Sequence, residues 1–187
     1  MDFANEPLYT VKYIENLPEG ERVELIDGVI YDMASPTRMH QRLLFELARI
    51  IADFIDNNKG ECEVNVAPFA VYLNNDEYNY VEPDLFVVCD KEKLDDKGCH
   101  GAPDWIIEVV SSSSQRMDYE LKLFKYRTAG VREYWIVDPK AETVFVHNFE
   151  KNEMETYRFS DLVPVRIYQS ENEDGLRIDF EEVFKRI

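Results

Sequence analysis

Two carboxylates and one lysine in the middle of the chain have the clearest potential for chemistry. Asp84 opens one short apolar run, and Glu108 lies inside another, the stretch from Trp105 to Val110. A carboxylate is costly to remove from water unless a cation or several hydrogen-bond donors meet it. If the two runs are neighbouring strands, both carboxylates converge at one end of a sheet, where oxygen ligands with open water positions suit Mg²⁺ or Mn²⁺.

Lys122 belongs to the helix that is predicted to follow the Glu108 strand. It shares one helical face with Asp118 and Tyr126, because the three residues are spaced i, i+4, i+8. We expect its ammonium to reach the same site and to orient or neutralise an attacking water. Each residue also has a structural interpretation: Asp84 as a turn or cap residue, Glu108 as a salt-bridged strand residue, and Lys122 as a surface ion pair with Asp118.

The elements that must position these residues follow from the apolar periodicity. It predicts a hairpin at 22–33 around Asp27-Gly28, a long helix at about 37–57 and a second helix at about 116–129, which starts after four serines and is closed by Gly130. Strands are expected at 62–66, 69–73, 85–89, 105–110, 133–137, 143–147 and 154–159, short helices after Thr10 and Asp179, and a loop at 90–103. The pattern indicates an α/β fold: a mixed β-sheet flanked by helices, with an N-terminal β-hairpin, in a single domain 1–187.

The composition is that of a globular protein with a sizeable core, since 45% of the 187 residues are hydrophobic. Neither a secretory leader nor an apolar run of about 20 residues is present, so we expect a cytoplasmic protein without a membrane partner. The cysteines, Cys62, Cys89 and Cys99, are odd in number and far apart. We therefore expect them to be reduced thiols.

The net charge of −17 opposes long-range attraction to nucleic acid. Residues 111–133 are the exception, with five basic side chains against three acidic ones. This window is either a nucleic-acid footprint or ordinary helix-surface chemistry. The basic residues are Arg116, Lys122, Lys125, Arg127 and Arg132.

A set of short motifs, taken in order, resembles the Uma-type family of bacterial proteins, which are described as restriction endonucleases and were once a domain of unknown function. The resemblance covers roughly residues 8 to 147 and implies the fold of the PD-(D/E)XK nuclease superfamily. The motifs are Glu24-Leu25-Ile26-Asp27-Gly28, His40, Val81-Glu82-Pro83-Asp84, Ile107-Glu108-Val109-Val110-Ser111, Asp118-x-x-x-Lys122-x-x-x-Tyr126 and Gly130-Val131-x-Glu133-Tyr134-Trp135-Ile136-Val137-Asp138-Pro139.

Carried over by position, Asp84 matches the Asp of the PD motif and Glu108 matches the acidic residue of the (D/E)XK strand. The superfamily lysine would fall two residues later, where this chain has Val110. The resemblance implies that the lysine has moved to the following helix as Lys122, whose long side chain can place an ammonium at the same point. Glu24 and His40 are weaker candidates, as extra ligands or shaping groups, and His40 can equally be a helix-cap or core-edge histidine.

These observations lead to a Mg²⁺- or Mn²⁺-dependent nuclease acting on phosphodiester bonds, with DNA as the expected substrate. Asp84 and Glu108 would hold the metal with the Val109 carbonyl, and Lys122 would stabilise developing charge. The alternative is a non-catalytic binding or regulatory module on a nuclease fold. A hydrolase of small phosphate esters would suit the acidic surface, but the chain has no phosphate-cradling Gly-rich loop. Restriction-like enzymes often dimerise, so a homodimer is a further possibility.

Overall fold

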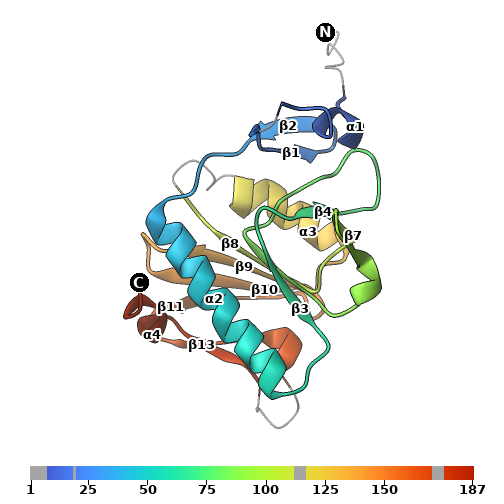
Figure 1. The fold of residues 1–187 in the computed structure, drawn as a ribbon. Coiled ribbons are helices and arrows are strands. Elements are labelled where there is room, and N and C mark those ends of the chain that lie inside the picture. The colour runs from blue at the N-terminus through green and yellow to red at the C-terminus, as the bar shows by residue number, and fades with distance from the viewer. Residues whose placement is uncertain (1–7, 19, 112–116, 170–174) are drawn as a thin grey trace.

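A six-stranded mixed sheet forms the centre of the computed structural model, which describes residues 8–18, 20–111, 117–169 and 175–187 (Figure 1). The strand order is β11-β10-β9-β8-β5-β3, and only β8 and β9 run parallel. The strands are β3 (Glu63–Val66), β5 (Leu85–Val88), β8 (Trp105–Val109), β9 (Glu133–Asp138), β10 (Thr143–Asn148) and β11 (Glu153–Arg158). The predicted α/β fold with a mixed sheet is confirmed.

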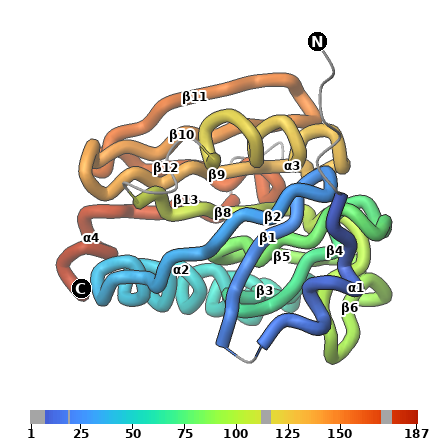
Figure 2. The backbone as a smooth tube through the Cα atoms, turned by 90° about the horizontal axis from the view of Figure 1, so that it is seen from above, coloured from blue at the N-terminus to red at the C-terminus, as the bar shows by residue number. Residues whose placement is uncertain are grey.

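Burial along the strands follows their place in the sheet. Every residue of β5, β8 and β9 is buried, as expected for central strands covered on both faces. The edge strand β11 is exposed at five of its six positions, and it lies at the opposite side of the sheet from β3 (Figure 2). The apolar runs around Asp84 and Glu108 therefore form the middle of the sheet.

Two apolar layers cover the two faces of this sheet. The helix α2 (Arg38–Asn57) packs Leu43, Leu47 and Ile51 against Val87 and Ile107 on one face. The other face carries the helix α3 (Leu123–Ala129), whose Tyr126 lies in a second cluster that includes Phe86, Ile106 and Ile136. Since successive side chains of a strand point to opposite faces, Glu108 points to the α3 face, as Ile106 does.

The predicted hairpin consists of β1 (Val23–Ile26) and β2 (Val29–Asp32) and lies beside α3, apart from the central sheet (Figure 1). Its turn residues Asp27 and Gly28 have φ of 51° and 76°, the left-handed conformation that a two-residue hairpin loop requires. A bridge between Leu25 and Tyr80 joins the hairpin to the segment that precedes Asp84. This junction brings the hairpin to the end of the sheet where the carboxylates lie.

The remaining elements are short. They are α1 (Val11–Ile14), β4 (Ala70–Tyr72), η1 (Lys91–Lys93), β6 (Leu94–Asp95), β7 (Gly98–His100), β12 (Leu162–Pro164), η3 (Arg166–Tyr168), β13 (Arg177–Asp179) and α4 (Phe180–Phe184). Asp179 caps α4 by accepting a hydrogen bond from the Glu182 N–H, as predicted, whereas the Thr10 side chain makes no capping bond to α1.

One expectation about local structure is wrong. Residues 90–103 are not simply a loop, because η1, β6 and β7 lie within them and β7 pairs with β4. The helix predicted at about 116–129 is present, and it starts as a π-helical segment, η2 (Met117–Lys122), before it continues as α3. The serines at 112–114, predicted to cap it, lie outside the described residues. Gly130 ends α3 in the left-handed conformation, with φ of 97°, as predicted.

The expectation of reduced thiols is wrong for two of the three cysteines. Cys62 and Cys89 form a disulfide, while Cys99 is free and buried. The pairing of β3 with β5, in which Glu63 faces Val88, continues to place Cys62 opposite Cys89. The two cysteines are 27 residues apart in the sequence, so the pairing could not be predicted without knowing that β3 pairs with β5. A membrane-crossing helix, long and apolar enough for a bilayer, is absent from the described residues.

Candidate active site

The antiparallel register of β5 and β8 brings Asp84 and Glu108 together. Leu85 pairs with Ile107, so that Asp84 and Glu108 are the next residues to face each other. The Asp84 N–H donates to Glu108 Oε2 at 3.3 Å, and the Val109 N–H donates to Asp84 Oδ2 at 2.8 Å. The predicted convergence of the two carboxylates at one end of neighbouring strands is present.

Lys122 lies at the same point, held by carboxylates from three segments. Its Nζ is 3.0 Å from Glu108 Oε1, 2.9 Å from Glu24 Oε2 and 3.7 Å from Asp118 Oδ1. The lysine side chain is only 7% exposed, so its pair with Asp118 is buried and is not a surface ion pair. The π-helical turn of η2 places both Asp118 and Lys122 on its buried side.

Glu108 is therefore met by several donors inside an otherwise apolar strand. Besides Lys122, the Tyr126 hydroxyl donates to Glu108 Oε1 at 2.7 Å. Tyr126 shares the helical face of Lys122, and that spacing was the available sequence signal for its contact with the site. Without a strand register, however, the sequence did not show that Glu108 was its acceptor.

The cluster contains more negative than positive charge. Burial raises the pKa of Glu108 well above its usual value, Lys122 opposes this rise, and the carboxylates of Asp84, Asp118 and Glu24 add to it. Burial lowers the pKa of Lys122, but the charges of Glu108, Glu24 and Asp118 outweigh burial, so the pKa lies well above that of a free lysine and the ammonium stays charged. Such a surplus of carboxylates favours uptake of a further cation.

His40 contacts the carboxylate that is most open to solvent. Its Nε2 lies 3.0 Å from Asp84 Oδ2, and the Asp84 side chain is 18% exposed against 4% for Glu108. The His40 Nδ1 is buried without a hydrogen-bond partner among the described atoms. Burial lowers the pKa of His40, but its hydrogen bond to Asp84 and the Asp84 charge outweigh burial, so that the pKa is raised overall. His40 is thus at the site itself, next to two of the expected metal ligands.

The donors at this position fit a hard divalent cation. Asp84 and Glu108 offer carboxylate oxygens, and Asp84 Oδ1 accepts no hydrogen bond from any residue that the structure describes. Among those residues, no three His, Cys, Asp or Glu side chains are arranged as a ready ligand set. A metal held here would rely on two carboxylates, a backbone carbonyl and water, as Mg²⁺ sites commonly do.

The basic window at 111–133 is largely neutralised. Lys122 is buried in the site, Lys125 forms an ion pair with Asp27 of the hairpin turn, and Arg132 lies 3.1 Å from Asp104 and 2.8 Å from Glu150. Arg127 is exposed and hydrogen-bonds Asn152, while Arg116 lies outside the described residues. The window is not a continuous basic surface in the part of the chain that is described.

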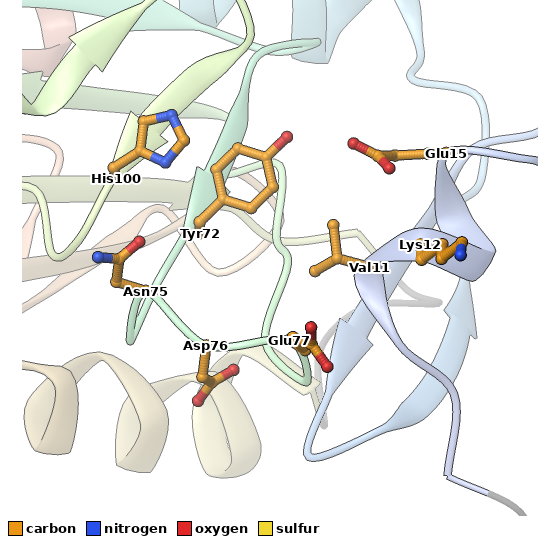
Figure 3. Close-up of a pocket in the computed structure, with 8 residues that line it drawn as sticks. All are labelled: Val11, Lys12, Glu15, Tyr72, Asn75, Asp76, Glu77 and His100. Atoms are coloured by element: carbon orange, nitrogen blue, oxygen red, sulfur yellow. The ribbon is translucent and has the colours of Figure 1, made fainter.

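A hollow of about 290 Å³ lies apart from these residues, between α1 and residues 72–77 (Figure 3). Tyr72 stacks on His100 beside it, and its lining includes the carboxylates of Glu15, Asp76 and Glu77 and one ammonium, that of Lys12. Since the carboxylates outnumber the ammonium, the hollow as a whole would repel a phosphate group. The hollow therefore gives no support to hydrolysis of small phosphate esters.

Comparisons with known proteins identify the family and the fold of this chain. The chain matches the model of the Uma2 family, described as "Putative restriction endonuclease", over residues 11–179. Two uncharacterized proteins of Synechocystis sp. are similar: one is 29% identical over 121 residues, 63% of this chain and 67% of the relative, and the other is 25% identical over 134 residues, 71% and 68%.

A solved structure shares the fold. It is the crystal structure of a "putative nuclease belonging to DUF820" from Anabaena variabilis, with a TM-score of 0.74 and 21% sequence identity. The match covers 94% of this chain and 97% of that one. At this level of identity the similarity shows a common fold.

Proposed function

Because the chain belongs to the Uma2 family of restriction-endonuclease-like proteins, we propose that it is a divalent-metal-dependent nuclease that hydrolyses phosphodiester bonds in DNA. The observation that carries this proposal is the meeting of Asp84, Glu108 and Lys122 at the end of β5 and β8. A purely structural ion pair would need one carboxylate for one lysine, whereas here several buried carboxylates surround a single ammonium.

In this proposal Asp84 and Glu108 hold Mg²⁺ or Mn²⁺ together with the Val109 carbonyl. When bound, the metal supplies positive charge that polarises the phosphate and lowers the pKa of water. Lys122 orients the attacking water and stabilises the charge that develops on the phosphate. Tyr126 and Glu24 keep the Lys122–Glu108 pair in place, and His40 holds the Asp84 carboxylate through Oδ2.

The test is a cleavage assay on varied DNA and RNA, with and without Mg²⁺ or Mn²⁺, using Glu108→Gln and Asp84→Asn. We expect metal-dependent cleavage of DNA by the wild type and its loss in both variants, with calorimetry showing that each variant loses metal binding. Glu63→Gln, an exposed residue of β3, is the matched control and should cleave normally. Equal cleavage by the wild type and Glu108→Gln would refute the assignment.

A non-catalytic binding module is the second candidate, and the charge distribution favours it. The net charge is −17, and the predicted basic window is mostly paired within the protein. This candidate predicts metal or ligand binding without cleavage of any nucleic acid in the same assay.

A further inference from the structure

We propose that Glu24 is a positioning residue, which shares the Lys122 ammonium with Glu108 and so leaves the Glu108 carboxylate available to a divalent cation. This inference rests on the proposed function, because it concerns the same site. It assigns a role to the hairpin, whose Glu24 is a further carboxylate at Lys122 beside Glu108 and Asp118.

The two oxygens of Glu24 join two different parts of the site. Oε1 accepts a hydrogen bond from the Glu82 N–H at 3.1 Å, two residues before Asp84. Oε2 lies 2.9 Å from Lys122 Nζ. The Glu24 side chain is 5% exposed, so both contacts are shielded from water. One carboxylate thus links the segment that carries Asp84, just before β5, to the helical segment that carries Lys122.

The hairpin holds Glu24 in this position through its backbone. Leu25 and Tyr80 exchange two hydrogen bonds, of 2.7 and 2.8 Å, and the Asp27 N–H donates to Asn79 Oδ1 at 3.1 Å. On the other side, Asp27 forms an ion pair with Lys125, three residues beyond Lys122. The hairpin that carries Glu24 is therefore held both by the segment before Asp84 and by the helix that carries Lys122.

The near-equal distances of 2.9 and 3.0 Å divide the lysine charge between Glu24 and Glu108. Without the Glu24 charge, the ammonium would pair mainly with Glu108 and would compete with a metal for the same carboxylate. Glu24 is not expected to be a ligand, because its oxygens already bond Glu82 N–H and Lys122. If Glu24 only positions Lys122, its substitution should not change metal affinity once Lys122 is neutralised. If Glu24 is a metal ligand, its substitution should still weaken metal binding.

The experiment compares Mn²⁺ affinity, measured by calorimetry, in the wild type, Glu24→Gln, Lys122→Met and the double variant. We expect Glu24→Gln to weaken Mn²⁺ binding by about tenfold, equivalent to about 1.4 kcal/mol. Lys122→Met should bind at least as tightly as the wild type, and the double variant should match Lys122→Met. Glu21→Gln, an exposed glutamate just before the hairpin, is the matched control and should leave the affinity unchanged.

Two results would overturn the proposal. One is unchanged Mn²⁺ binding in Glu24→Gln. The other is weaker binding in the double variant than in Lys122→Met, as additive effects of the two substitutions would give, because Glu24 would then act on the metal independently of Lys122, as a ligand does. The same four proteins are also compared by thermal unfolding without metal. If the wild type binds no Mn²⁺, the proposed metal site is wrong. The thermal unfolding midpoints then test the Glu24–Lys122 contact by itself. Losses of midpoint that are not additive in the double variant support the contact, and additive losses refute it.

Discussion

At the scale of single residues, Glu108 shows how a buried carboxylate can be kept inside a strand of tryptophan, isoleucine and valine. Three donors meet it, from Lys122, Tyr126 and the Asp84 backbone. Lys122 and Tyr126 lie on successive turns of the helix formed by η2 and α3, whereas Asp84 directly precedes β5, so the donors come from two separate parts of the chain. This arrangement makes the contribution of Lys122 separable from that of the metal ligands.

Replacing Lys122 by Met keeps the aliphatic stem and removes the charge. If the ammonium stabilises charge in the transition state, cleavage should fall by roughly two to four orders of magnitude. Because Lys122 is buried against carboxylates, stability should also fall, by about 3 kcal/mol or more, unless they take up protons or a metal. Single-turnover cleavage with saturating Mg²⁺ measures the first effect and urea unfolding the second. Cleavage at the wild-type rate would show that the lysine has no part in the reaction.

At the scale of elements, most helices and strands could be predicted because each has its own apolar period. The helix α2 and the buried strands β5, β8 and β9 fall within a residue or two of their predicted bounds. The short pairs β6–β7 and β12–β13 carry no such period, since they are only two or three residues long. The sequence pattern does not distinguish the π-helical start of the second helix from an ordinary α-helix, since Asp118 and Lys122 would share one face in either.

The same reasoning explains what could be predicted of the site. The sequence alone pointed to Asp84 and Glu108 because each is a carboxylate at or within an apolar run. It pointed to Lys122 because this residue shares a helical face with Asp118 and Tyr126. The Glu24 contact could not be predicted, because it depends on where the hairpin docks, and the neutralisation of Lys125 and Arg132 depends on partners far along the chain. The disulfide likewise depends on the pairing of β3 with β5.

Glu133 anchors the segment around η3 to β9. Its oxygens accept hydrogen bonds from the Arg166 N–H at 3.0 Å, the Ile167 N–H at 2.8 Å and Trp135 Nε1 at 2.6 Å. Burial raises its pKa to about 7, although these donors act to lower it. The folded protein therefore keeps a proton that the unfolded chain loses near pH 4.5.

It follows that the contribution of Glu133 to stability is full below about pH 4.5 and is lost as the pH rises to about 7 and beyond. We expect the free energy of unfolding to fall over this window, and an NMR titration of the Glu133 side-chain carboxyl to have its midpoint near 7. Glu133→Gln should remove this part of the pH dependence. A midpoint at the ordinary glutamate value would contradict the prediction.

The Cys62–Cys89 disulfide ties the edge strand β3 to the central strand β5 and closes a loop with a sequence separation of 27. A crosslink of this length restricts the unfolded chain and should stabilise the fold by about 2–4 kcal/mol. Urea unfolding of Cys62→Ser/Cys89→Ser should show that loss, and reduction of the wild type should reproduce it. Equal stability of the oxidised protein and the double variant would contradict this prediction.

At the scale of the whole molecule, the charge of −17 and the pairing of the basic window indicate few phosphate contacts. With about one or two such contacts, the logarithm of DNA affinity should fall with the logarithm of salt with a slope of only about −1 to −2. Asp27→Asn removes the partner of Lys125 and should steepen the slope by about one, whereas Arg127→Ala should flatten it. A steep slope in the wild type would contradict this expectation and would support the interpretation of residues 111–133 as a nucleic-acid footprint.

The attachment of the hairpin has a consequence for how the molecule opens. Its strands pair with each other and meet the rest of the protein through backbone hydrogen bonds of Leu25 with Tyr80 and of Gly28 with Tyr78 and through side-chain contacts, not through the six-stranded sheet. Such a unit can open without breaking the hydrogen bonds of that sheet. We therefore expect the amide hydrogens of Leu25 and Tyr80 to exchange with deuterium through a local opening that is nearly independent of denaturant, while those of Ile107 and Trp135 exchange only on global unfolding. During each local opening Lys122 would lose Glu24, so the rate of exchange at Leu25 would also report how often the site is incomplete.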